Sequence, residues 1–333
     1  MSDFALVIYP EQKQEELPEG KFGKYFEGLM EIMHSMLKIS EPEEEFEAVE
    51  LYDNLKAYLI ELPFNPVDTG KSCNSSKIGR FISKACAKVN MANCILPRGI
   101  PEICGFDGGI RNSFTGRYLY KALLISILDE IYTKRGTKIS ELDIAIVEGE
   151  SGDELFSIIT SLTPLVKYLT VLVNDNEAVE REINRIYTDT GLSVMMTGNL
   201  KSGCKNADLI INLGGIREAI SGIKPKAVVL NYDNSGACNI LGEYVLINGI
   251  EVSLPEETLA RIGGLACKHF SKLELAEIIL SHRVNMEDKI IANCMDFESM
   301  SGLSREFKKT GCRVTGFKGR HNIFKAEDIK NKI

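Results

Sequence analysis

The sequence predicts an α/β protein, with a small N-terminal α/β domain followed by a doubly wound parallel sheet domain. From residue 142 onward, short apolar segments alternate with helical patterns, which is typical of a parallel sheet covered on both faces by helices. The first 110 residues also mix short apolar strands with helical spacing. A chain of 333 residues is longer than one hydrophobic core usually serves, so we expect two domains.

The N-terminal domain is expected to span residues 1–112, with strands at 4–9, 46–51 and 56–62. Apolar residues at spacings of three and four predict a helix after these strands; they are Ile78, Phe81, Ile82, Ala85 and Val89. Residues 104–117 contain four glycines and two arginines, which indicates a loop. A connecting helix is expected over 113–136, because Leu119, Leu123 and Ile127 continue an apolar stripe and Gly136 ends it.

The second domain is expected over residues 137–285, as a Rossmann-type sheet. Its predicted strands are 143–148, 168–173, 192–196, 207–212, 226–231 and 244–247, with helices from about 152 and over 176–190. Two of these strands end in Asn212 and Asn231, at the edge of the sheet where such folds bind ligands. S-x-x-E capping boxes at Ser253 and Ser271 predict two further helices. Residues 286–333 are expected to form a C-terminal β-α-β extension, with strand 289–293, helix 297–310 and strand 312–317.

Composition excludes several classes of function. A net charge of −8 and a pI near 5.3 argue against nucleic-acid binding, which depends on clustered Lys and Arg. No apolar segment reaches the length that a membrane helix needs, so we expect no membrane association and a cytoplasmic location. The nine cysteines lack C-x-x-C spacing and only four histidines are present, so we expect reduced thiols and no metal site.

The turn after the first strand of the second domain is the main candidate site. A dinucleotide fingerprint G-x-G-x-x-G would place its three glycines at Gly149, Ser151 and Glu154, so only the first is present. Gly152 would relax the turn, whereas Glu150, Asp153 and Glu154 would repel a pyrophosphate. An alternative stays open, because Ser151 to Glu154 also matches a capping box that would use the same backbone donors.

After the second strand of this domain, Asn174 and Asp175 offer polar groups for a ribose. No nearby Arg suits a 2′-phosphate, so NAD is favoured over NADP as the cofactor. Asp175 is equally suited to an ordinary helix cap. The cofactor-binding candidates are therefore Gly149, Ser151, Gly152, Asn174, Asp175 and Asn212.

This order of parts resembles the shikimate/quinate dehydrogenase-like superfamily, including the long-chain acyl carrier protein reductases, over roughly residues 56–280. The segment from Gly109 to Gly116 is similar to a family segment whose Asn and Asp hold substrate; it keeps Asn112 and has Phe114 at the Asp position. The family's catalytic Lys has only a poor counterpart in the segment that ends at Lys71. The resemblance implies a dehydrogenase-like fold, with a cysteine nucleophile if the reductases are the better comparison.

The resemblance implies Cys238 as a weak catalytic candidate, and Cys104 is another because Arg111 and Arg117 lie near it in sequence. The alternative for both cysteines is an inert thiol. Arg111, Asn112 and Arg117 are the substrate-binding candidates, since Arg in a glycine loop can hold a carboxylate or phosphate. The alternative for these arginines is a surface role beside the acidic segments.

The leading hypothesis is an NAD(P)-dependent oxidoreductase of this superfamily that acts on an anionic small molecule. The rival is a non-catalytic Rossmann-fold module for ligand sensing or protein interaction that has lost dinucleotide binding. Methyl transfer from S-adenosylmethionine is a third class, which the N-terminal domain and extra helices fit less well. We expect a small-molecule ligand as partner, and assembly into a homo-oligomer stays open.

Overall fold

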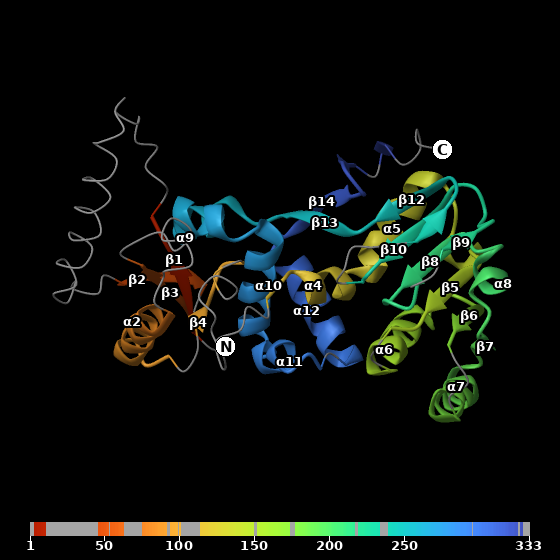
Figure 1. Cartoon of the computed structure of the whole chain (residues 1–333), viewed down its shortest axis with the longest axis horizontal. Coiled ribbons are helices and arrows are strands. Elements are labelled where there is room, and N and C mark those ends of the chain that lie inside the picture. Colours follow the sequence, from red (N-terminus) through yellow and green to blue (C-terminus); the bar gives the residue numbers. More distant parts are fainter. Residues whose placement is uncertain are drawn as a thin grey trace, which may run out of the picture. The chain divides into compact units, whose positions relative to one another are not determined.

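A computed structural model describes residues 3–10, 46–52, 54–62, 75–91, 94–98, 100, 114–149, 152–173, 177–216, 219–233, 239–294, 296–325 and 327–328 (Figure 1). The chain forms two compact units. The first comprises Met1–Asn112 with Glu256–Ser271, and the second comprises Ser113–Pro255 with Lys272–Ile333. Each unit has its own sheet and its own buried core.

The first unit contains a four-stranded sheet in the order β2-β3-β1-β4. β1 pairs in parallel with β3 and β4, whereas β2 is antiparallel to β3. The predicted strands and the predicted helix of this region are confirmed, since Ile78, Ile82 and Ala85 of α2 are buried against the sheet. The elements of the unit are β1 (Phe4–Ile8), β2 (Phe46–Tyr52), β3 (Leu55–Glu61), α2 (Ser75–Lys88), β4 (Cys94–Ile95) and α9 (Glu256–His269).

The second unit is built on a six-stranded parallel sheet in the order β12-β10-β8-β5-β6-β7. Numbered from the first strand of the unit, this is the order 3-2-1-4-5-6 of a Rossmann sheet. The predicted fold class and all six predicted strands are thus confirmed. The strands are β5 (Ile144–Val147), β6 (Tyr168–Leu172), β7 (Ser193–Thr197), β8 (Leu209–Asn212), β10 (Ala227–Asn231) and β12 (Tyr244–Ile247).

Helices connect β5 to β6, β6 to β7 and β7 to β8, because a parallel pair cannot be joined by a tight turn. The predicted helices are α6 (Gly152–Leu162) and α7 (Glu177–Thr190), and a short α8 (Leu200–Cys204) follows β7. Figure 1 shows α6 and α7 on one side of the sheet. Cys204 of α8 joins a buried cluster with Ala145, Ile210 and Val229 from the central strands. The strands read as continuous apolar segments because most of their side chains are covered.

The predicted connecting helix consists of α4 (Arg117–Ala122) and α5 (Leu124–Arg135), which meet at Leu123. Leu123 has φ −88° and ψ 8°, outside the helical region, so the helix is interrupted there although Leu119, Leu123 and Ile127 form a continuous buried stripe. Gly136 ends α5 in the left-handed conformation, with φ 71°, as expected for a C-terminal glycine.

The C-terminal region differs from the predicted β-α-β extension. The strand predicted over 289–293 is wrong, because these residues belong largely to a helix in which Ile290 is buried and Ile291 is 43% exposed. A short apolar segment does not distinguish strand from helix by periodicity, which explains the error. The final strands form an antiparallel sheet in the order β13-β14-β15. The elements here are β13 (Gly249–Ser253), α10 (Lys272–Arg283), α11 (Glu287–Ile291), α12 (Phe297–Lys309), β14 (Arg313–Lys318) and β15 (Ile323–Phe324).

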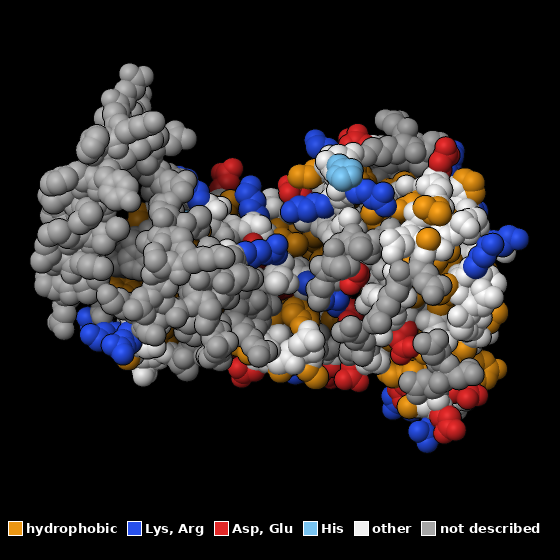
Figure 2. Space-filling view, viewed as in Figure 1, with side chains coloured by type: hydrophobic (Ala, Val, Ile, Leu, Met, Phe, Trp, Pro, Cys, Tyr) orange, Lys and Arg blue, Asp and Glu red, His pale blue; other side chains and the backbone are white. Residues whose placement is uncertain are grey.

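The surface of the described residues is mixed in charge. On the face in Figure 2, acidic and basic side chains are interspersed among the coloured residues. Within the same residues, every helix is too short or too polar to cross a membrane.

Candidate functional site

The turn from β5 into α6, which contains Gly149 and is called the glycine turn below, lies at the switch point of the sheet. At this point the strand order reverses between β5 and β8. At Gly149, a Cβ atom would lie 2.1 Å from the carbonyl oxygen of Leu213, which follows β8. A Cβ at Gly215 would lie 2.1 Å from the carbonyl oxygen of Glu148. The loops that follow β5 and β8 therefore touch backbone to backbone, and glycine is required at both contacts.

Gly152, the first residue of α6, is different. Among the described residues, a Cβ at Gly152 would meet only Phe156 Cε2, at 3.8 Å, an ordinary van der Waals distance. The packing of the described protein therefore does not require glycine there, although glycine is unfavourable in a helix. A ligand that approaches the backbone at the start of α6 would explain this residue.

Three asparagines are linked along the carboxyl edge of the sheet. Asn212 Nδ2 donates to Asn231 Oδ1 at 2.7 Å, and Asn231 Nδ2 donates to Asn248 Oδ1 at 3.0 Å. Asn212 Oδ1 also accepts from the backbone N–H groups of Gly214 and Ile216, at 3.1 and 3.3 Å. Asn212 is fully buried. Its side chain thus shapes the loop after β8, while its predicted role in cofactor binding stays a prediction.

An ion pair at the first turn of α6 was not predicted from the sequence, although the acidic residues of this turn were. Lys121 of α4 forms an ion pair with Glu154 of α6, and both side chains are largely buried. Burial lowers the pKa of Lys121 to about 8, although the Glu154 carboxylate opposes this effect. Nearby, the Tyr118 hydroxyl donates to Asn293 Oδ1. Lys121 thus partly neutralises the acidic turn that the sequence indicates.

The sequence gives little indication of this ion pair. Lys121 is a single lysine in an otherwise apolar helix pattern, where a lysine usually lies on the exposed side of the helix. The predicted capping box at α6 also stays a prediction, since Ser151 lies outside the described residues. One oxygen of Glu154 is engaged by Lys121.

A second buried acid, Glu277 of α10, holds the start of α4. Its Oε2 accepts from the backbone N–H of Gly116 at 2.8 Å, and its Oε1 accepts from those of Tyr118 and Leu119 at 3.0 and 3.3 Å. Burial raises the pKa of Glu277 to about 7, against the opposing effect of these three N–H groups. Glu277 therefore positions the segment that leads from the predicted substrate loop into α4.

The structure describes only some of the predicted site residues. Gly149, Gly152 and Asn212 lie at the carboxyl edge, and Arg117 is the first residue of α4. The buried Nε of Arg117 has no hydrogen-bond partner among the described residues. Phe114, at the position of the family Asp, is buried with its ring centroid 5.7 Å from that of His282. The remaining candidates, Cys104, Arg111, Asn112, Ser151, Asn174, Asp175 and Cys238, lie outside the described residues.

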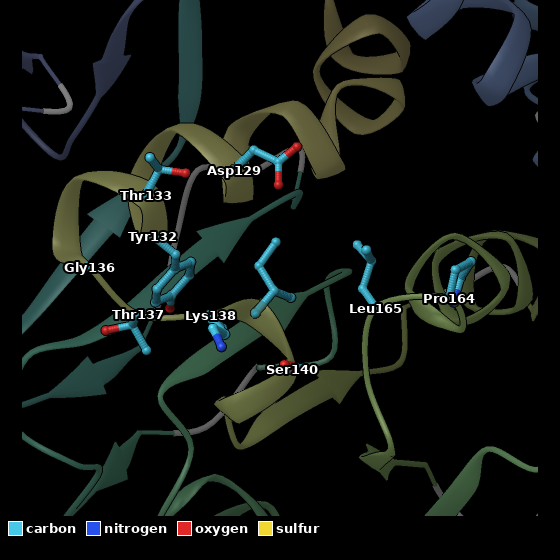
Figure 3. Close-up of a pocket in the computed structure, with 10 residues that line it drawn as sticks. Asp129, Tyr132, Thr133, Gly136, Thr137, Lys138, Ser140, Pro164 and Leu165 are labelled. Atoms are coloured by element: carbon cyan, nitrogen blue, oxygen red, sulfur yellow. The ribbon is translucent and has the colours of Figure 1, made fainter.

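A cavity of about 490 Å³ lies at the opposite edge of the same sheet (Figure 3). Its lining comes from the end of α5, from the 3-10 helix η2 (Ile139–Glu141), and from Pro164 and Leu165. These segments precede β5 and β6, so the cavity is at the amino ends of the strands. It is therefore separate from the glycine turn. Across the described residues, no group of three His, Cys, Asp or Glu side chains is arranged to hold a metal ion.

No protein-family model and no curated protein sequence matches the chain. Among solved structures, shikimate 5-dehydrogenase from Listeria monocytogenes, in complex with shikimate and NAD, is 9% identical with a TM-score of 0.28, over 99% of this chain and 95% of that one. Aspartate transcarbamoylase from Trypanosoma cruzi is 11% identical with a TM-score of 0.29, over 91% of this chain and 83% of that one.

Δ(1)-pyrroline-2-carboxylate reductase from Thermococcus litoralis, in complex with NADH and L-proline, is 8% identical with a TM-score of 0.27. That match covers 35% of this chain and spans 36% of the reductase. Because these TM-scores are below 0.5, none of the matches indicates an activity for this chain. The class of the second unit, a doubly wound α/β domain of Rossmann topology, rests on its own strand order.

Proposed function

We propose that this protein is an NAD(P)-dependent oxidoreductase that binds its dinucleotide at the carboxyl edge of the six-stranded sheet. The observation that carries this proposal is the position of Gly149 and Gly152, in the turn from β5 into α6 at the switch point of the sheet. Ligands of doubly wound sheets bind in the crevice at this point, with the pyrophosphate at the helix N-terminus.

Two features of this turn support the proposal. Gly149 permits a close backbone contact with the loop after β8, and it stands at the first position of a dinucleotide fingerprint, where glycine allows the tight turn. Gly152 leaves the backbone of α6 open to a ligand. Lys121 brings a positive charge to the turn, beside Glu154, so the net negative charge that a pyrophosphate would meet is smaller than the sequence alone indicates.

The cofactor preference and the substrate class rest on sequence positions. Asp175 follows β6, the second strand of the sheet, where an acid accepts hydrogen bonds from the adenosine ribose of NAD. We therefore favour NAD over NADP. An anionic small molecule is the proposed substrate, held by Arg111, Asn112 and Arg117, with Cys104 and Cys238 as weak catalytic candidates.

The test is calorimetric titration of the whole chain with NADH, NADPH, NAD and NADP. The variant Gly152→Ala should weaken NADH binding at least about tenfold, or about 1.4 kcal/mol, because its Cβ would stand where the ligand approaches. Gly264→Ala is the matched control, since Gly264 also lies in a helix and a Cβ there would meet no described atom within 4 Å. Gly264→Ala should leave binding unchanged.

Failure of all four nucleotides to bind the wild-type chain would overturn the oxidoreductase proposal. That result would favour the non-catalytic ligand-sensing or protein-interaction module. Equal NADH affinity in Gly152→Ala and wild type would instead show that the dinucleotide binds away from the start of α6.

A further inference from the structure

A small cavity adjoins the first turn of α6 within the second unit. Its volume is about 30 Å³, which is room for about one water molecule. Three segments contribute to it: α4, the start of α6, and the segment from α11 into α12. The lining residues are Tyr118, Lys121, Asp153, Glu154, Asn293, Cys294 and Met300.

Lys121 is the cation of this cavity. It is 5% exposed, and Glu154 is its ion-pair partner. Its Nζ lies 5.9 Å from the centroid of the Tyr118 ring, so an aromatic face also contacts the charge. Arg117 lies one turn earlier on α4 and adds a second positive charge on that side of the helix. This ammonium group has therefore already lost most of its contact with bulk water in the folded chain.

Two buried donors that do not line this cavity, one of them on α4, have no hydrogen-bond partner within the part of the chain that the structure describes. They are the Nε of Arg117 and the hydroxyl of Tyr232, which is 1% exposed. Tyr232 follows β10, and the Glu154 carboxylate is close enough to contribute to raising its pKa. Buried donors without partners are rare in native proteins, so both groups are suited to donate to a water molecule or an anion.

We propose that Lys121 is an anion-binding residue, that Glu154 occupies it in the ligand-free chain, and that a phosphate group of the ligand takes the place of the Glu154 carboxylate. The inference rests on the proposed function, since the ligand is the one assigned to the start of α6. Lys121 then has an anionic partner in both states, the Glu154 carboxylate without ligand and the phosphate with it. The N–H groups and dipole of α6 favour an anion at the same place.

The phosphate could come from the pyrophosphate of a dinucleotide or from a separate phosphorylated molecule. Two probes distinguish these sources: NADH and inorganic pyrophosphate. Both are titrated by calorimetry into the wild-type chain and into Lys121→Met, Glu154→Gln and Glu306→Gln. The last variant is the matched control, because it breaks the Arg283–Glu306 ion pair, whose side chains are 11% and 12% exposed, outside this cavity.

We expect Lys121→Met to weaken binding of NADH about tenfold, because a charge-assisted hydrogen bond to phosphate is lost. Glu154→Gln should strengthen binding several-fold, because the competing carboxylate is gone. Glu306→Gln should bind as the wild type does. Since misfolding cannot strengthen binding, Glu154→Gln decides the question even if Lys121→Met does not fold.

The outcomes separate this inference from the proposed function. If NADH binds wild type and Lys121→Met equally, Lys121 is not a phosphate ligand. If Glu154→Gln binds NADH no more tightly than wild type does, a ligand phosphate does not replace the Glu154 carboxylate at Lys121. If pyrophosphate binds through Lys121 but NADH does not bind, the oxidoreductase proposal fails and the anion site stands. If neither probe binds the wild-type chain, both proposals fail.

Discussion

Glu277 and Gly116 are 161 residues apart, and the carboxylate of Glu277 accepts a 2.8 Å hydrogen bond from the backbone N–H of Gly116. The same carboxylate accepts two further N–H groups at the start of α4. One buried side chain on α10 therefore satisfies donors that the first turn of a helix leaves without partners. Several consequences of this contact and of the glycine turn can be measured.

Replacement of Glu277 should change how stability depends on pH. The folded-state pKa of about 7 is above the value of 4.5 for a free glutamate, so the folded chain keeps a proton that the unfolded chain releases. Stability should therefore fall as pH rises from about 4.5 to about 7, and then stay level. At about 1.4 kcal/mol per pKa unit, the decrease is on the order of 3 kcal/mol.

Urea unfolding of wild type and Glu277→Gln at pH 5, 6, 7 and 8 measures this effect. The variant should lose this contribution to the slope between pH 5 and pH 7. If Glu277→Gln kept the full wild-type slope of unfolding free energy against pH, groups other than Glu277 would cause the pH dependence.

Alanine at Gly116 should destabilise the second unit more than alanine at Gly136. Both glycines have positive φ, 77° and 71°, so both substitutions carry strain of about 1–2 kcal/mol. A Cβ at Gly116 would also lie 2.5 Å from Leu273 Cγ, whereas a Cβ at Gly136 would have no atom of the described residues within 4 Å. Displacement of Leu273 should add about 1 kcal/mol or more. Equal unfolding free energies in chemical denaturation would contradict the crowding at Gly116.

The two glycines of the turn should respond to alanine in opposite directions. Gly149→Ala forces its Cβ against the Leu213 carbonyl oxygen and should cost about 1–3 kcal/mol. Gly152→Ala meets no close atom among the described residues and should raise stability by about 0.5–1 kcal/mol, because alanine is the better helix residue. Thermal unfolding of both variants without ligand measures this, and a destabilised Gly152→Ala would refute the open space at that position.

Removal of the Asn212 side chain should loosen the loop after β8. Asn212→Ala leaves the N–H groups of Gly214 and Ile216 without their acceptor, at a cost of about 1–3 kcal/mol. Asn199→Ala is the control, because Asn199 caps α8 at an exposed position and its loss should cost about 1 kcal/mol. Hydrogen exchange should speed up at Gly214 and Ile216 in Asn212→Ala alone; unchanged exchange would mean that Asn212 does not hold this loop.

Much of the second unit could be predicted from residue order. Its strands are buried, so Ile144–Val147 and Ala227–Asn231 read as short apolar segments of the kind that parallel sheets use. The segment around Ile290 was predicted wrongly because five residues are too few for periodicity to separate strand from helix. The break at Leu123 was also hidden, since its side chain continues the apolar stripe.

The candidate site likewise contains some features that the sequence predicts and others that only the tertiary structure shows. Local sequence placed Gly149 and Gly152 in the turn after β5, because a turn between a strand and a helix depends on neighbouring residues. The pairing of Lys121 with Glu154 could not be predicted, because it joins two helices whose packing depends on the whole unit.

By itself, the sequence determined the alternation of strands and helices and the polar ends of β8 and β10, since both depend on spacing along the chain. Only the tertiary structure decided that the two loops at the switch point touch at Gly149 and that Glu277 holds α4. The physical reason is that burial, hydrogen bonding and charge pairing act between residues that are close in space, and their separation in sequence carries no signal of that proximity.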